Sequence, residues 1–204
     1  MLKLHHSPTS PYVRKVMVLL AETGQSADVA LLPASGSPID PGTMPVTQNP
    51  LGKIPALERP DGPALFDSRV ICRYLDDRAK AGLYPAAPRL WETLTLESMA
   101  DGMVDAAILM VYESRLRPEE IRLPAWVEGQ WSKVARALDM LEARWLPYLS
   151  GPLCMGQIAL GCAIGYIDFR HDARNWRATR PGLAAWDARF AARPAMVATR
   201  PPAA

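Results

Sequence analysis

The chain has 204 residues, of which 49% are hydrophobic, and a formal net charge of +2 at pH 7. This length is enough for one large or two small domains, and the interspersed acids and bases argue against nucleic acid as a partner and against a polybasic membrane anchor. No apolar run approaches the roughly 18 residues that a membrane span needs, so we also expect no membrane partner.

The chain opens with a short apolar stretch, residues 2–5, which predicts a buried strand. Lys3 and the two histidines after it interrupt the region where a signal peptide would need apolar residues, so we expect a cytoplasmic protein. Residues 7–15 then lead into a helix that ends near Gly24. Ser10 is a favoured N-cap residue, and Pro11 suits the first helical turn. A hydroxyl at a helix N-terminus lies where proteins hold anions.

A second strand is predicted over residues 27–32, followed by a loop over 33–50 that is rich in Pro, Gly, Ser and Thr. Two short apolar pieces, 54–57 and 64–66, flank an Asp-Gly turn and predict a β-hairpin. Asp67 and Ser68 then precede a helical apolar pattern. The order β-α-β-loop-β-β-α predicts a small α/β domain over residues 1–79, and residues 80–87 read as a linker.

Beyond the linker, strand-like alternation disappears, and residues 88–204 predict an all-helical domain. Two long amphipathic helices are expected around residues 96–110 and 127–145, packed against each other. A third, over about 157–170, is apolar nearly all round, which is typical of a buried central helix. A last short helix is predicted over 181–190. The three cysteines form no C-x-x-C pair and no metal-binding spacing, so we expect neither disulfides nor a metal site; they are Cys72, Cys154 and Cys162.

This architecture resembles that of the cytosolic glutathione S-transferase superfamily, in particular its bacterial members with serine at the active site. The resemblance covers essentially the whole chain and rests on four stretches in order, which are residues 7–15, 49–57, 67–71 and 158–170. It implies a thioredoxin-like N-terminal domain that binds glutathione, followed by an all-α C-terminal domain that supplies the electrophile pocket. It also implies a homodimer.

By this resemblance, Ser10 is the catalytic residue, whose hydroxyl donates a hydrogen bond to the glutathione sulfur and favours the thiolate. The thiolate is the nucleophile, and a free thiol of pKa about 8.5 is mostly protonated at neutral pH. Thr9 is the alternative, because the turn geometry decides which hydroxyl faces the sulfur. A purely structural role of Ser10, as a helix cap, also remains open.

The resemblance assigns the remaining parts of glutathione to two further stretches. Ile54 and Pro55 match the cis-proline position, whose preceding backbone pairs with the cysteinyl part, and Lys53 could meet the glycine carboxylate. Asp67 matches the residue that takes the γ-glutamyl ammonium, and Ser68 with the helix N-terminus takes the carboxylate. The alternative roles are a solvated surface lysine for Lys53 and an ordinary N-cap for Asp67 and Ser68.

The implied function is a glutathione transferase with glutathione as co-substrate, which conjugates small hydrophobic electrophiles or reduces organic hydroperoxides, as in detoxification. The alternative is a non-catalytic glutathione-binding or regulatory protein of the same fold. No cysteine stands at Thr9 or Ser10, which argues against thiol-transferase chemistry. Residues that could line the electrophile pocket, although apolar helical positions are more often core, are Met103, Ala106, Met110, Tyr112 and Trp176.

The central helix departs from the family pattern at its start. A Ser/Thr-x-x-Asp capping box is usual there, whereas this chain has Cys154 and Gln157. Cysteine is a poor N-cap, and we expect an eroded box. The sequence therefore predicts that Cys154→Ser combined with Gln157→Asp raises the thermal midpoint.

Overall fold

The computed structural model describes residues 1–202, which form two compact units. The first comprises Met1–Ala86 together with the segment that begins at Pro194, and the second comprises Ala87–Arg193. The first boundary falls within the expected linker, 80–87. The segment from Pro194 onward differs from the expected division, which placed it in the helical domain over 88–204.

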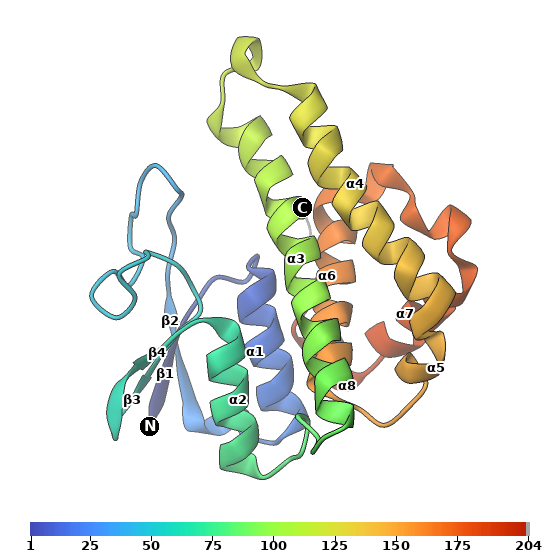
Figure 1. Cartoon of the computed structure of the whole chain (residues 1–204). Helices are drawn as coiled ribbons and strands as arrows, with labels where there is room; N and C mark the ends of the chain where they lie inside the picture. The colour runs from blue at the N-terminus through green and yellow to red at the C-terminus, as the bar shows by residue number, and fades with distance from the viewer. Residues whose placement is uncertain (203–204) are drawn as a thin grey trace. The chain divides into compact units, whose positions relative to one another are not determined.

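The first unit contains a four-stranded mixed sheet with the strand order β2-β1-β3-β4. β1 pairs in parallel with β2 and antiparallel with β3, and β3 pairs antiparallel with β4. Two helices, α1 and α2, pack beside each other on the sheet (Figure 1). The bounds are β1 Leu2–His6, α1 Pro11–Glu22, a 3-10 turn Ser26–Asp28, β2 Val29–Pro33, β3 Ala56–Arg59, β4 Gly62–Leu65 and α2 Ser68–Ala79. The predicted order of elements is confirmed.

Local chemistry explains where α1 begins. Ser10 is its N-cap, and the side chain accepts a hydrogen bond from the Val13 N–H at 3.3 Å. Pro11 occupies the first turn, where its missing N–H costs nothing. The buried residues Val13, Val16 and Leu20 then hold the helix in the core.

A short helix that the sequence analysis did not predict, α8 (Pro194–Ala198), packs on α1 in the same unit. The Arg14 Nη2 donates to the Met196 carbonyl at 3.1 Å, across 182 residues of chain. Ala195 and Met196 are both buried. This contact explains why the chain returns to the first unit after Arg193.

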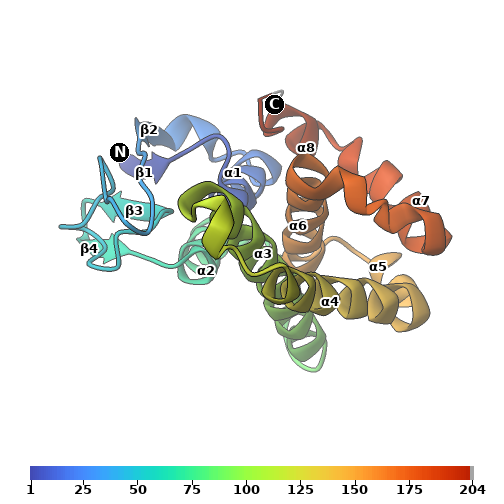
Figure 2. The ribbon, with the colours of Figure 1, turned by 90° about the horizontal axis from the view of Figure 1, so that it is seen from above.

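The second unit is all-helical, and α3 and α6 lie side by side at its centre (Figure 2). α6 can approach α3 closely because Gly156 has no side chain. A Cβ at this position would stand only 2.9 Å from the Thr93 carbonyl oxygen. Within residues 1–202, no helix is long and apolar enough to cross a membrane. The helices are α3 Arg89–Leu116, α4 Pro124–Met140, a π turn Leu141–Trp145, α5 Leu146–Leu149, α6 Met155–His171 and α7 Pro181–Ala191, with 3-10 turns at Glu119–Ile121, Asp172–Arg174 and Trp176–Thr179.

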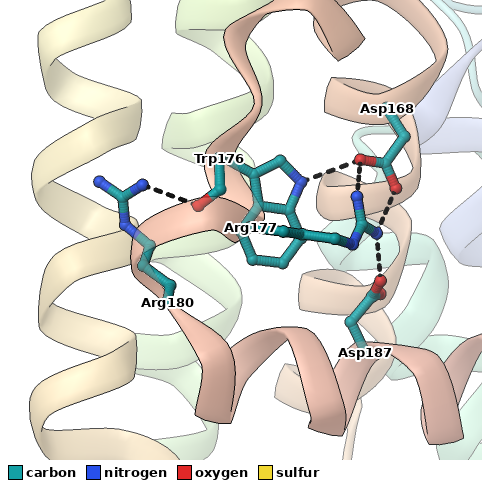
Figure 3. Close-up of polar contacts among 5 residues, drawn as sticks. All are labelled: Asp168, Trp176, Arg177, Arg180 and Asp187. Atoms are coloured by element: carbon teal, nitrogen blue, oxygen red, sulfur yellow. Dashed lines mark hydrogen bonds and ion pairs between the residues drawn. The ribbon is translucent and has the colours of Figure 1, made fainter.

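A polar network joins the end of α6 to the turn before α7 and to α7 itself (Figure 3). The Arg177 guanidinium bonds both oxygens of Asp168, at 2.6 and 2.7 Å, and it also bonds Asp187 at 2.5 Å. The Trp176 indole N–H donates to Asp168 at 2.9 Å. The hydrogen bonds to Asp168 and Asp187 raise the pKa of Arg177, in spite of its partial burial. One cation thus holds three segments together.

The start of α6 corrects the expectation of an eroded capping box. Both halves of the box are present, and the Gln157 Oε1 accepts from the Cys154 N–H at 2.8 Å. The Gln157 amide also donates, to the carbonyls of Leu149 at 2.9 Å and Gly151 at 3.3 Å. Aspartate has no donor for these carbonyls. Glutamine is therefore the better residue here.

We accordingly expect Gln157→Asp to lower the free energy of unfolding by about 0.5–1.5 kcal/mol, because the Leu149 carbonyl loses the Gln157 donor and keeps only the Trp186 indole N–H at 3.0 Å. This reverses the sequence-based expectation for that half of the double substitution. Cys154→Ser alone tests the cap itself and should leave the midpoint unchanged or higher. Urea unfolding of the two single variants measures each effect, and a Gln157→Asp midpoint above that of the parent would contradict our account.

Candidate functional site

The strand register brings three separated stretches to one edge of the sheet. β1 ends at His6, beside the last residue of β2, and His5 pairs with Ala56 at the start of β3. β4 runs antiparallel to β3 and ends at Leu65, opposite Leu57. Residues 7–10, 54–55 and 66–68 therefore leave or enter the sheet at the same edge, and the N-termini of α1 and α2 follow there.

The first stretch presents three hydroxyls. Ser10 accepts from the Val13 N–H with a lone pair, so its own O–H proton remains available to a ligand. Thr9 Oγ1 lies 3.3 Å from Ser7 Oγ, and these two hydroxyls share a hydrogen bond. Thr9 is thus paired with Ser7, whereas Ser10 is the N-cap of α1 and lies at the positive end of the helix dipole.

The second stretch is shaped by a buried asparagine, Asn49, for which the sequence predicts no role. The Asn49 side chain donates to the Lys53 carbonyl at 2.8 Å and accepts from the Leu51 N–H at 3.1 Å. The loop then enters a cis peptide between Ile54 and Pro55. Asparagine side chains commonly hydrogen-bond nearby backbone groups, and this property could have indicated that Asn49 shapes the loop. The Lys53 side chain is exposed.

The third stretch begins α2. Asp67 is the N-cap, and one of its oxygens accepts from the Arg69 N–H at 2.9 Å. The Asp67 residue is exposed, so its second oxygen can meet a cation, while Ser68 is buried in the first turn. The Phe66–Asp67 peptide is cis. A carboxylate and a helix N-terminus side by side suit a zwitterionic group.

Other reactive side chains of this unit lie apart from that arrangement. His5 Nε2 hydrogen-bonds Glu58 Oε1 at 2.7 Å, so that histidine is engaged within the sheet. Cys72 is fully buried in α2. Among the residues that the structure describes, no three His, Cys, Asp or Glu side chains gather as they would around a metal ion.

The residues suggested for an electrophile pocket differ in exposure. Four of the five are buried, and only Tyr112 retains intermediate exposure. Trp176 belongs to the polar network of Figure 3, where its indole N–H donates a hydrogen bond to Asp168. The buried residues are Met103, Ala106, Met110 and Trp176.

Comparisons with known proteins agree with this arrangement. Family models for the N-terminal and the C-terminal domain of glutathione S-transferases match residues 9–78 and 124–189. A glutathione transferase family member from Pseudomonas fluorescens Pf-5, crystallised with bound glutathione, is 47% identical, with a TM-score of 0.96, over 99% of this chain and 100% of that one. A second structure from that organism, with bound S-(propanoic acid)-glutathione, is 46% identical with a TM-score of 0.92, over 99% and 100%. YibF of Escherichia coli K12, an uncharacterised GST-like protein, is 33% identical over the full length of both chains.

Proposed function

Because this chain belongs to the glutathione S-transferase superfamily, we propose that it is a glutathione transferase of the bacterial serine type. It takes glutathione as co-substrate, stabilises the thiolate, and adds it to small electrophiles or uses it to reduce organic hydroperoxides. A cytoplasmic homodimer with a role in detoxification is part of this proposal. The observation that carries it is the convergence of Ser10, the cis Ile54–Pro55 peptide and Asp67 at one sheet edge.

The three stretches offer complementary groups to the three parts of the tripeptide. Asp67 takes the γ-glutamyl ammonium, and Ser68 with the N-terminus of α2 takes the adjacent carboxylate. The backbone before Pro55 pairs with the cysteinyl amide, and Lys53 takes the glycine carboxylate. This order leaves the sulfur at the N-terminus of α1. Glutathione bound to the Pseudomonas fluorescens relative supports the same choice of ligand.

Ser10 provides the chemistry. Its O–H donates to the sulfur, and the positive end of α1 adds a favourable field, so both stabilise the thiolate over the thiol. Thr9 is the second choice. The relative that holds S-(propanoic acid)-glutathione, a thioether of glutathione, supports conjugation as the reaction type.

Two measurements test the function. Retention on immobilised glutathione tests binding, and turnover of a generic aryl halide and of cumene hydroperoxide tests catalysis. We expect retention and measurable turnover of at least one of these compounds. Retention without turnover of either would favour the non-catalytic alternative, and no retention would contradict the proposed ligand.

Asp67→Ala is expected to weaken glutathione binding by about 10–100-fold, because a charge-assisted contact to the ammonium is lost. Asp67→Asn is the matched control, since asparagine is an equally good N-cap without the charge. We expect Asp67→Asn to keep the thermal midpoint and still lose most of the affinity in calorimetric titration. Wild-type affinity in the Asn variant would show that Asp67 only caps α2.

A further inference from the structure

Arg14 is a buried cation near the start of α1, at the end of the helix that disfavours positive charge. Its backbone N–H donates to the Ser10 carbonyl at 3.0 Å, so it lies one helical turn after the residue proposed to activate the thiolate. The residue is only 9% exposed. Burial and the positive end of the helix dipole both raise the free energy of a cation at this position. The arrangement is therefore costly unless an anion completes it.

The contacts of the Arg14 guanidinium fix it without neutralising it. Its Nη2 donates to the Met196 carbonyl of α8 at 3.1 Å, and a carbonyl carries no net charge. Its Nε is buried and has no hydrogen-bond partner among the described residues. Within residues 1–202, no carboxylate lies within ion-pair distance of this guanidinium. The turn that follows Ser10 thus holds a positive charge without a counter-ion.

The acids on the elements that pack on α1 do not supply this counter-ion. α1 contacts α8, which has no charged side chain, and also α2 and the 3-10 turn before β2. On α2, Asp76 accepts from two backbone N–H groups that follow the helix. Asp77 and, in the 3-10 turn, Asp28 are each ion-paired with another side chain. Glu22 is the last residue of α1, at the opposite end of the helix from Arg14.

We propose that Arg14 stabilises the glutathione thiolate through its charge, as a second group behind Ser10. The inference rests on the proposed transferase function, in which the sulfur binds at the N-terminus of α1. The Cα–Cβ bonds of a helix tilt toward its N-terminus, so the Arg14 side chain leaves the helix toward that end. The thiolate is then the anion that the unit itself lacks, and the positive charge favours it over the neutral thiol.

Arg14 supports the thiolate from a distance, whereas Ser10 touches the sulfur. A hydrogen bond requires contact, but a charge that is poorly screened by water acts over several ångströms. The Met196 carbonyl contributes because it keeps the guanidinium from turning toward water, where screening would remove most of the effect. α8 is thereby part of the site, although it follows the helical unit in the chain.

Titration of the thiolate absorbance of glutathione bound to the full-length protein tests this role. We expect Arg14→Gln to raise the pKa of the bound thiol by about one unit, because a unit charge in the next helical turn is lost. Arg14→Lys keeps the charge and should keep most of the effect on the thiol pKa. Arg73→Gln, which removes an exposed arginine of α2 where water screens the charge, should leave the thiol pKa unchanged.

Two further measurements separate an electrostatic role of Arg14 from a structural one. S-methylglutathione has no ionisable thiol, so Arg14→Gln should bind it with the affinity of the parent protein. The thermal midpoint should not fall, since the substitution removes a buried charge that lacks a counter-ion. Should the glutamine variant not fold, Arg14→Met removes the charge in the same way.

An unchanged thiol pKa in Arg14→Gln would overturn the inference while the transferase function stands. An equal rise in Arg14→Gln and Arg14→Lys, together with weaker binding of S-methylglutathione, would also overturn it, because Arg14 would then only hold α1 in place. If the parent protein does not bind glutathione, the proposed function itself fails, and the role of Arg14 fails with it.

Discussion

Arg177→Met is expected to lower the free energy of unfolding by about 2–3 kcal/mol, a large share of the stability of a typical domain. The Arg177 guanidinium is the shared partner of Asp168 and Asp187. Without it, two carboxylates face each other, and the side chain of Asp187 is only 7% exposed. The expected loss is smaller than for a fully buried pair because the Arg177 side chain is 39% exposed and partly screened by solvent. Urea unfolding followed by circular dichroism measures it.

The control for Arg177→Met neutralises the acids as well. A triple variant with Arg177→Met, Asp168→Asn and Asp187→Asn removes the repulsion between the two acids, and asparagine keeps the size of aspartate. If lost charge pairing with Arg177 is the cause, the triple variant should recover much of the lost stability, because the two amides carry no charge for Arg177 to balance. A triple variant as unstable as Arg177→Met would show instead that the packing of the arginine stem matters.

Local features of the chain were sufficient to predict the elements of the first unit. The Ser10-Pro11 start of α1 and the turn from Arg59 to Gly62 depend on residues next to each other, and both are found as expected. The stretches proposed for the site came instead from the resemblance to the family. That they meet at one edge depends on the strand register, which an element order alone leaves open.

Contacts between distant residues could not be predicted, because a hydrogen bond across the chain leaves no periodicity in the sequence. α7 is capped by Glu142, whose two oxygens accept from the backbone N–H groups of Gly182 and Leu183 at 3.0 and 2.6 Å. α8 depends in the same way on the bond from Arg14. The sequence-based expectation for Gln157 is wrong for this reason, since its side-chain amide donates to the carbonyls of Leu149 and Gly151, which precede α6.

Ser10→Ala is expected to lower kcat/KM for conjugation by about 100-fold, the usual effect of removing one donor from a developing or stabilised anion. The pKa of the bound glutathione thiol should rise toward that of a free thiol, so the acidic limb of the pH profile of kcat/KM should move to higher pH. Titration of the thiolate absorbance in the ultraviolet measures this shift directly, without turnover. A role of Ser10 limited to capping would leave both the absorbance titration and the pH profile unchanged.

The matched control is Thr9→Val, which removes the neighbouring hydroxyl while it keeps the shape of the side chain. Ser10→Ala also removes an N-cap, which costs about 1 kcal/mol, so thermal melts must accompany the kinetics. Ser10→Thr keeps both the cap and a donor, and should restore part of the activity. Because the Thr9 hydroxyl already shares a hydrogen bond with Ser7, we expect Thr9→Val to change the thiol pKa little. The opposite pattern, an intact Ser10→Ala and an impaired Thr9→Val, would move the sulfur contact to Thr9.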